Sequence, residues 1–336
     1  MENRHWYYFS PNGKAAPIKG LSLADTLALR KKGGFLWLVY ITPKKEDLQP
    51  LAESLGIHPL SIDDCFDEDY LPKMDLFTDY AGILFNDFVN GADSVSVREV
   101  NFFLGKDYLV SVFREGKVDL ARCEAVLAEL SGEALGAGAG PARVLYAILD
   151  RIIDSKFSSV EQVGDRISKV EDLILTGAGA VDNMAVHGIR QNLMVMRKTL
   201  FHEREILARI CRHDSPLFQK ADLAYFSNLY DHLAKFVEIV ESNRETITNL
   251  VQIQLSLASN AMAESANHTN RSVNRLTLIT TIFMPLSLIA GIGGMSEWTM
   301  MTGPGNWKLA YPILIGAMAL VGGINFIFLK KFERKE

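Results

Sequence analysis

Seven positions between residues 270 and 291 recur at steps of three or four, which is the spacing of one face of an α-helix. Four of the seven side chains are an amide or a hydroxyl, which can hydrogen-bond or offer an oxygen to a cation. We call this set the polar stripe; its members are Asn270, Val273, Thr277, Thr280, Met284, Ser287 and Gly291. Its chemistry is that of a surface along which water or a cation could pass.

Two interpretations of the polar stripe remain open. In hydrocarbon, a polar side chain faces either a partner or a water-filled cavity, so the stripe could line a pore. Alternatively, the hydroxyls bond to carbonyls of their own helix and pack against a neighbouring helix. Pro285 lies within the same segment and frees the carbonyl of Thr281. Two helices cannot enclose a channel, so a pore would need several copies around an axis.

Two uncharged stretches near the C-terminus are long enough to cross a membrane. Residues 276–295 and 309–329 contain no Asp, Glu, Lys or Arg, and each would span about 30 Å as a helix. The short connection between them, residues 296–308, permits a hairpin. Cations cluster before the first stretch and in the tail at 330–336, whereas the connection carries one lysine. This asymmetry predicts that both termini are cytoplasmic.

The composition excludes several function classes. Lys and Arg total 35 against 40 Asp and Glu, which argues against a nucleic-acid partner. The three cysteines are far apart, so no disulfide framework or paired-cysteine metal site is expected. The seven histidines show no metal-binding spacing, and no nucleophile elbow, P-loop or dinucleotide fingerprint is found, so an enzyme is not expected.

The first third of the chain predicts mixed α/β structure. Stretches rich in β-branched and aromatic residues predict strands at 35–41, 80–88, 95–104 and 108–113. Residues 45–55 and 59–66 are expected to be helical, with Pro59 suited to a first turn. The Gly- and Ala-rich stretch 131–140 is expected to be a loop.

Long helices follow Pro141, because apolar residues recur there at steps of three and four. Breaks at 176–182 and 213–216 separate a second helix at 183–212. From residue 217 there is no proline before Pro285 and no glycine before Gly291, which predicts one helix that enters the first span. Residues 255–269 are small and polar, which suits either a wet lumen or a solvated linker.

These patterns predict a linear organisation of the chain. An α/β domain comes first, then a helical hairpin, a stalk helix, two spans joined by an external loop, and a basic cytoplasmic tail. The α/β domain is expected at 1–140, the helical hairpin at 141–216 and the stalk helix at 217–275. The two spans are expected at 276–295 and 309–329, the external loop at 296–308 and the tail at 330–336.

Several motifs together resemble the CorA family of divalent-cation transporters. The first span carries FMPL at 283–286 and IAGI at 289–292, and the second opens with Tyr311-Pro312. In the N-terminal part, IDDC at 62–65, followed by Pro72-Lys73 and Tyr80, is similar to the family's cytoplasmic signature. The resemblance covers almost the whole chain, and it rests on the combination rather than on one motif.

The resemblance implies a funnel-shaped homopentamer in the inner (plasma) membrane. It implies an α/β cytoplasmic domain, long stalk helices and two C-terminal transmembrane helices, of which the first lines the pore. Its partners are copies of the chain, the lipid bilayer and divalent cations, with no nucleic acid. Mg²⁺ or another divalent cation is the substrate and a regulator, and no covalently bound cofactor is expected.

The resemblance also assigns roles to single residues. Leu276 and Met284 become hydrophobic constrictions that gate by dewetting. Asn270, Thr280 and Ser287 offer oxygens to ions or to their water. Gly294, Met295 and residue 296 form the outer selectivity filter, and one acidic residue of the external loop, Glu297, concentrates cations.

The chain departs from the family at Ser296, where the family has asparagine. A ring of the shorter serine is wider and holds a hydrated ion less tightly, which matters because Mg²⁺ gives up its water reluctantly. Relatives similar to the zinc transporter ZntB also vary this signature. Mg²⁺ therefore remains the leading substrate, with a zinc or other transition-metal transporter, or a non-conducting membrane-anchored sensor, as alternatives.

The family's cytoplasmic metal sensors use carboxylates between neighbouring protomers. By location alone, the candidates are Asp87 and Asp93 after the central strand, and Asp231 and Glu238 on the stalk helix. The alternative interpretation is that these four are solvated surface charges. A gating metal at such a site would hold the funnel closed.

Overall fold

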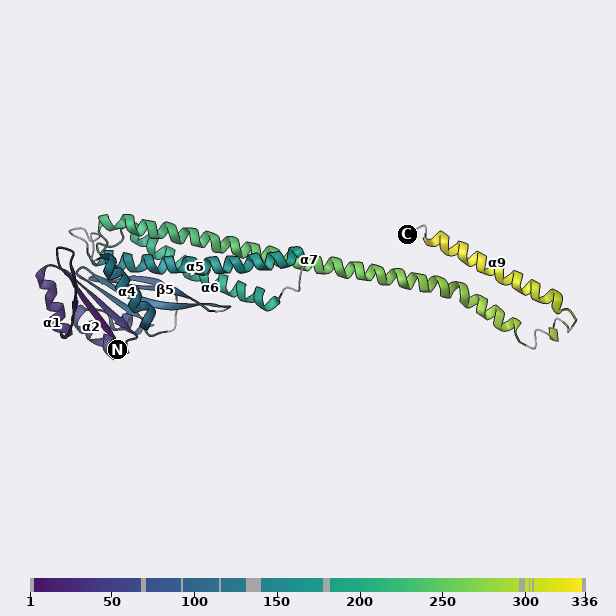
Figure 1. The fold of residues 1–336 in the computed structure, drawn as a ribbon, viewed down its shortest axis with the longest axis horizontal. Helices are drawn as coiled ribbons and strands as arrows, with labels where there is room; N and C mark the ends of the chain where they lie inside the picture. Colours follow the sequence, from purple (N-terminus) through teal and green to yellow (C-terminus); the bar gives the residue numbers. More distant parts are fainter. Residues whose placement is uncertain are drawn as a thin grey trace. The chain divides into compact units, whose positions relative to one another are not determined.

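A computed structural model gives the fold of the chain in two compact units, Met1–Gln252 and Ile253–Glu336 (Figure 1). The structure describes residues 3–67, 71–91, 93–114, 116–130, 140–177, 182–295, 300–301, 303 and 305–333. Expected residues outside these ranges, among them Ser296 and Glu297, lie outside the described structure.

The first unit contains one mixed sheet, which has seven strands in the described residues, in the order β2-β1-β3-β7-β6-β5-β4. Strands β3 and β7 pair in parallel, and the other neighbours are antiparallel. The strands are β1 Arg4–Phe9, β2 Ala15–Ile18, β3 Phe35–Ile41, β4 Lys73–Leu76, β5 Tyr80–Asn90, β6 Val95–Gly105 and β7 Tyr108–Phe113. The four predicted strands are confirmed as β3, β5, β6 and β7.

Strand β3 explains why two apolar layers form. All seven of its residues are buried, and alternate side chains enter different cores, since successive residues of a strand point to opposite faces. Trp37 and Val39 join the core on the side of the long helices, whereas Leu36 and Leu38 join the core on the other side. The second core is covered by α1 Leu23–Ala28, α2 Lys45–Leu55 and α3 Pro59–Asp63.

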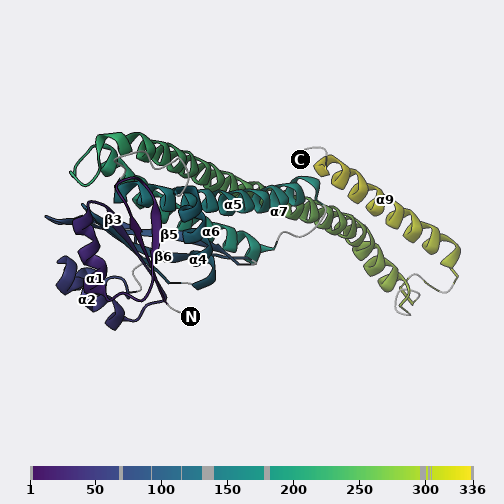
Figure 2. The same cartoon turned by 60° about the vertical axis from the view of Figure 1, so that its left-hand side comes forward.

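The other helices of the unit are α4 Gly116–Leu130, α5 Pro141–Thr176, α6 Asn183–Cys211 and the first part of α7 Lys220–Gly293; the single turn η1 Leu29–Lys32 follows α1. Helix α5 packs on the sheet, against β3, β5, β6 and β7 (Figure 2). Both predicted breaks are confirmed. Helix α5 starts with a proline in its first turn and ends at Gly177 in the left-handed region, and Asp182 caps the start of α6.

Helices α5 and α7 run parallel in a constant register. Arg143 Nε donates to Asp222 Oδ1 at 3.1 Å, across a separation of 79 residues. The same separation joins the ring pairs Tyr146–Tyr225 and Phe157–Phe236, whose centroids lie 5.1 and 5.9 Å apart. A register kept over four turns shows that α5 braces this part of α7 along its length.

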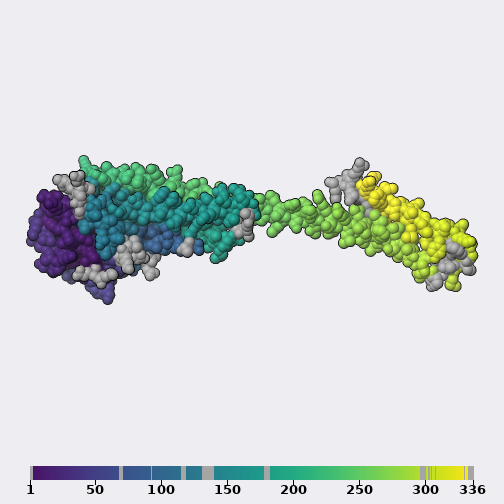
Figure 3. All heavy atoms as spheres, in the orientation of Figure 1, coloured from purple at the N-terminus to yellow at the C-terminus, as the bar shows by residue number. Residues whose placement is uncertain are grey.

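The second unit consists of the rest of α7 and of α9 Trp307–Glu333. Both helices contain a segment that is long and apolar enough to cross a membrane, and these segments are 6% and 0% buried. Every side chain from residue 255 to residue 277 is exposed. Figure 3 shows this green segment of α7 with its own side chains at the surface. The expected long helix and two candidate spans are therefore confirmed.

Candidate functional site

The polar stripe lies on α7, and all seven of its side chains are exposed in the isolated chain. The apolar members and Leu276 are as exposed as the polar ones: Val273 is 52%, Leu276 65% and Met284 69% exposed. The stripe is therefore a continuous uncovered face of the helix.

A different face of α7 packs on α9. Its side chains are half-buried or buried at helical spacing, at Leu278, Ile282, Leu286, Ile289 and Gly293. A Cβ built on Gly293 would overlap Leu314 of α9, and one on Gly322 would lie 3.6 Å from Leu286 Cδ1. Phe283, between Ile282 and Met284, does not belong to this face and is 61% exposed. Since α9 occupies this face, the polar stripe is left for water or another copy of the chain.

The stripe's threonines use their hydroxyl hydrogens within their own helix. Thr277 Oγ1 donates to the carbonyl of Val273 at 2.9 Å, and Thr280 Oγ1 donates to that of Leu276 at 2.8 Å. This is the geometry of the second interpretation of the stripe. It also leaves each hydroxyl oxygen free to accept, so both oxygens can face a hydrated cation.

The predicted outer filter begins where α7 ends. The helix ends at Gly293, and the backbone N–H groups of Gly294 and Met295 still donate to carbonyls of its last turn, at 3.0 and 3.2 Å. Met295 is 53% exposed. The remaining filter residue, Ser296, and the loop acid Glu297 belong to the stretch that the structure leaves undescribed.

Asp87 is neither solvated nor available to a metal. The side chain is buried in β5, where its carboxylate lies 2.6 Å from Arg98 Nη2 and 2.5 Å from Arg122 Nη2, and accepts a hydrogen bond from Ser155 at 2.8 Å. Burial opposes ionisation, but the cation of Arg122, with the other two partners, outweighs it and holds the pKa of Asp87 below its ordinary value. The solvated interpretation of Asp87 is wrong, and its oxygens are already engaged.

A second buried ion pair lies beside it. Lys156 of α5 and Glu203 of α6 are fully buried and joined by a hydrogen-bonded salt bridge. Glu203 also accepts from the backbone N–H of Asn86 at 2.9 Å, and the Lys156 ammonium lies 4.7 Å from the ring centre of Phe85. The Lys156–Glu203 pair was not predicted from the sequence. Its one local signal is Lys156 itself, a lysine among the apolar residues of α5, which indicates a buried and paired charge.

The other three regulatory candidates are exposed and separate. The Asp93 carboxylate lies 4.0 Å from Arg166, and Asp231 and Glu238 are exposed on α7. Within the described ranges, no group of three or more His, Cys, Asp or Glu side chains could hold a metal ion. Asp93, Asp231 and Glu238 therefore do not form a metal site within one chain.

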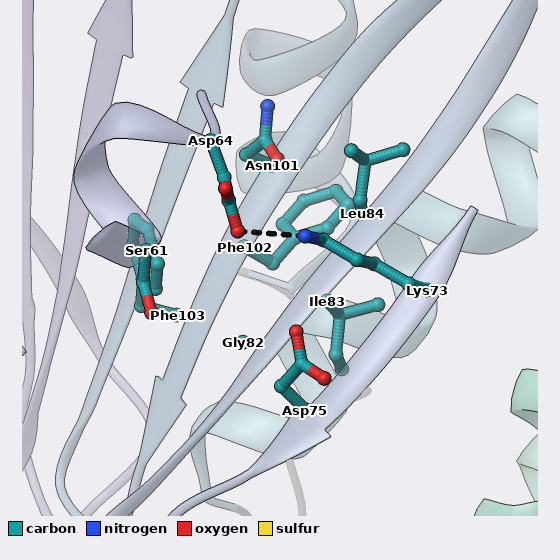
Figure 4. A pocket seen from close by; sticks show the side chains of 10 residues that line it. All are labelled: Ser61, Asp64, Lys73, Asp75, Gly82, Ile83, Leu84, Asn101, Phe102 and Phe103. Carbon is teal, nitrogen blue, oxygen red and sulfur yellow. Dashed lines mark hydrogen bonds and ion pairs between the residues drawn. The ribbon is translucent and has the colours of Figure 1, made fainter. Parts of the chain in front are cut away.

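The IDDC signature ties α3 to the sheet. Lys73 Nζ lies 2.6 Å from Asp64 Oδ2 (Figure 4), and the Tyr80 hydroxyl accepts from the backbone N–H of His58 at 3.0 Å. A cavity beside the Asp64–Lys73 pair, lined also by Ser61 and Asp75, has a volume of about 20 Å³, which is enough for one water. The signature is thus explained by packing rather than by a ligand.

Comparisons with known proteins cover nearly the entire chain. Residues 32–331 match the family model described as CorA-like Mg²⁺ transporter protein. The cobalt/magnesium transport protein CorA of Thermotoga maritima is 30% identical over 94% of this chain and 87% of its own length. The complete structure of the CorA magnesium transporter from Methanocaldococcus jannaschii has the same fold, with a TM-score of 0.69, 20% identity, and coverage of 98% of this chain and 97% of its own.

Similarity also extends to a zinc protein. The zinc transport protein ZntB of Yersinia enterocolitica is 24% identical over 48% of this chain and 48% of its own length. The relatives of this chain are therefore named for the transport of cobalt and magnesium or of zinc.

Proposed function

Because the chain belongs to the CorA-like Mg²⁺ transporter family, we propose that it forms a homopentameric divalent-cation channel whose substrate is Mg²⁺. Membership confirms the resemblance deduced from residues 283–286 and 289–292, and it identifies the chain as a membrane transporter rather than an enzyme. The substrate, the number of copies and the gating belong to the proposal.

The observation that carries the proposal is the uncovered polar stripe. One chain leaves the stripe exposed on α7 while α9 covers another face of the same helix. In a membrane, such a face must meet water or another protein surface. Five copies around an axis would place five stripes on a shared lumen, with the five α9 helices outside them.

The bare segment of α7 supports the oligomer. From residue 255 to residue 277 the isolated chain covers no side chain, and Leu255, Met262 and Leu276 are between 65% and 73% exposed. A helix of this length is not stabilised by propensity alone, so packing against copies of itself is expected. Small residues between these apolar ones would allow close approach.

Residue roles follow from this arrangement. Leu276 and Met284 would form hydrophobic constrictions, and Asn270, Thr280 and Ser287 would supply oxygens before, between and after them. Gly294, Met295 and Ser296 would form the outer filter, with Glu297 attracting cations to it. In the inner membrane, the cationic tail would keep both termini on the cytoplasmic side. The membrane potential would drive cations inward.

We also propose that cytoplasmic metal gates the channel through carboxylates of neighbouring copies. Asp93, Asp231 and Glu238 remain the candidates because they are exposed in the isolated chain. Asp87 is not among them, because Arg98 and Arg122 already neutralise it. Metal held between two copies would favour the closed channel, and its loss would let the copies separate.

Zinc is the second candidate substrate, favoured by the similarity to ZntB and by serine at position 296. A wider ring of hydroxyls holds the hydration shell of Mg²⁺ less well, and zinc binds nitrogen and sulfur ligands as readily as oxygen. The remaining alternative is a non-conducting membrane-anchored sensor, for which no cation would pass through the protein.

The test is cation uptake by proteoliposomes that contain the purified full chain. Mg²⁺, Co²⁺, Ni²⁺ and Zn²⁺ are compared for the wild type, for Ser296→Asn, and for Ser158→Asn as a control at an exposed serine of α5. Mg²⁺ uptake that Ser296→Asn makes more selective supports the proposal. A preference for Zn²⁺ overturns the magnesium assignment, and no uptake of any cation by either version overturns transport.

A further inference from the structure

Four cations lie where the apolar segments of α7 and α9 adjoin charged sequence. On α7 the uncharged stretch begins at Leu276, directly after Arg275, and on α9 it ends directly before Lys330. We call Arg271, Arg275, Lys330 and Lys331 the cationic rim. All four side chains are exposed. The rim therefore marks the boundary between apolar and charged sequence on both helices.

The packing of α9 on α7 brings the rim to one end of the hairpin. Gly293 of α7 lies against Leu314 of α9. Gly322 of α9 lies against Leu286 of α7, so the two helices run antiparallel, as Figure 1 and Figure 2 show. Continued for two more turns, this register places the lysines of the rim within about 4 Å of Arg275 along the helix axis. Cations from both helices therefore gather at one level.

No residue of the rim belongs to the polar stripe. The arginines of the rim precede Leu278 at steps of four and three, so they continue the face of α7 that packs on α9. On α9, the face that meets α7 includes half-buried Gly322 and Asn325, and it continues at residues 329 and 332. The lysines of the rim lie on the other side of α9, away from α7. The rim is thus turned away from the surface that the proposed function assigns to the lumen.

The two helices do not supply enough anions to neutralise the rim. The segments 271–275 and 330–336 carry six cations and two carboxylates. Apart from Glu297, in the connection between the spans, residues 265–332 contain no acid. In the part of the chain that the structure describes, no rim side chain takes part in a salt bridge. The rim is therefore a site of net positive charge at a membrane boundary.

The position and the chemistry of the rim fit the phosphate groups of lipids. An apolar segment that crosses a bilayer ends at the level of the headgroups. Arginine presents a planar fork that matches two phosphate oxygens, and lysine adds a compact charge. The Lys330 ammonium lies 6.0 Å from the ring centre of Phe326, so its stem follows an apolar group while its charge stays at the boundary. Basic clusters of this kind, next to a span, attract anionic lipids.

We propose that the cationic rim binds anionic phospholipid headgroups, with the arginines of α7 and the lysines of α9 holding phosphates of the same leaflet. Bound lipid joins α7 to α9 at the end of the hairpin that is not closed by the connection. The inference requires that the two spans cross a membrane. It requires neither conduction nor a particular cation, so it goes beyond the proposed function and does not depend on it.

Spin-labelled lipids test the inference on the full chain in phosphatidylcholine proteoliposomes. Spin-labelled phosphatidylglycerol should associate with the protein about three times more strongly than spin-labelled phosphatidylcholine does. This association ratio should fall below about 1.5 when the four rim residues are all replaced by glutamine. The charge-retaining variant Arg271→Lys/Arg275→Lys should keep most of the ratio, and concentrated salt should lower it by screening. Lys169→Gln/Lys220→Gln, at two exposed lysines of the first unit, is the control.

Melting curves in detergent show whether each variant folds, and the salt dependence of the wild type decides the question if the glutamine variant does not. Equal association of the two lipids, or a ratio that neither salt nor glutamine lowers, overturns the inference even if the wild type transports cations. A smaller oligomer of the glutamine variant with an unchanged ratio overturns it too, because the rim then binds carboxylates of another copy. A ratio that responds as expected, in a protein that passes no cation, supports lipid binding and overturns the proposed function instead.

Discussion

Charged and polar groups are handled in opposite ways in the two units. In the α/β unit, three anions and three cations gather together, and each lies against a partner. Arg122 is half-buried and the other five are buried: Asp87, Asp119, Glu203, Arg98 and Lys156. In the C-terminal unit the polar stripe of α7 is exposed, and its threonines bond only to their own helix.

The difference shows which unit is complete as a single chain. Buried charges are tolerated only when each is paired and hydrogen-bonded, and these six side chains meet this condition without any other molecule. The polar stripe meets no partner in one chain, although it lies in a segment apolar enough for a membrane. Under the proposed function, the partners missing from the second unit are further copies of the chain and the cations that pass between them.

The largest effect on stability is expected when one partner of the buried Lys156–Glu203 pair is removed. Lys156→Met should lower the free energy of unfolding by about 3–5 kcal/mol, because Glu203 is left as an uncompensated buried charge. The double variant Lys156→Met/Glu203→Leu should lose less than this single variant does. Melting curves of the purified chain measure both, with the exposed Lys169→Met as control. A double variant less stable than Lys156→Met would contradict the account.

A smaller effect is expected at Asp87, and it depends on pH. Its pKa in the folded chain lies below the ordinary value of 3.8, so its ionised form stabilises the fold above that value, and this contribution is lost as the pH falls through the folded pKa. Asp87→Asn should cost about 1.5–3 kcal/mol at pH 7, where the charge-assisted bonds to Arg98 and Arg122 are intact. The difference in the free energy of unfolding between the wild type and Asp87→Asn should shrink as the pH falls below 3.8, the ordinary pKa of an aspartate.

Melting temperatures of the wild type and of Asp87→Asn, followed from pH 7 to pH 3, measure this dependence. The exposed Asp165→Asn on α5 serves as the control. A gap between wild type and Asp87→Asn that stays constant over the whole range would show that the carboxylate does not act through its charge.

The smallest effect on stability is expected in the polar stripe. Thr280→Val removes only the bond to the carbonyl of Leu276, which already has its helical partner, so the loss should stay within about 0.5 kcal/mol. Ser155→Ala, which likewise removes one hydroxyl but at a half-buried serine bonded to Asp87, should cost about 1–2 kcal/mol. Mg²⁺ uptake should reverse the order, falling with Thr280→Val and not with Ser155→Ala. Uptake unchanged by Thr280→Val would argue against a pore at this face.

Local signals in the sequence predict the long helices well, whereas α1 and α4 are not predicted. Pro141, the glycines after Thr176 and the stretch at 213–216 each mark an end that the structure confirms. The absence of proline before Pro285 predicts the length of α7, since nothing interrupts its backbone hydrogen bonds. Strands β1, β2 and β4 are missed, because short strands at or near a sheet edge carry little pattern of their own.

The buried charges are missed for a different reason. Asp87 and Arg98 become neighbours only through the register of β5 and β6, and Arg122 and Ser155 arrive from two further helices. No spacing in the sequence encodes such a meeting. The polar stripe, by contrast, lies on one helix, so its periodicity is enough to define it, and its exposure follows once α9 takes another face.

The continuity of α7 has a consequence for how the gene can vary. Each residue of an α-helix turns the chain by about 100°, and α7 contains no break between Lys220 and Pro285 that could absorb an added or missing residue. One codon lost between residues 255 and 269 would therefore rotate the whole polar stripe out of phase with the helix before it. Length changes should be tolerated in the connections between elements, whereas the bare segment should accept substitutions but keep its length.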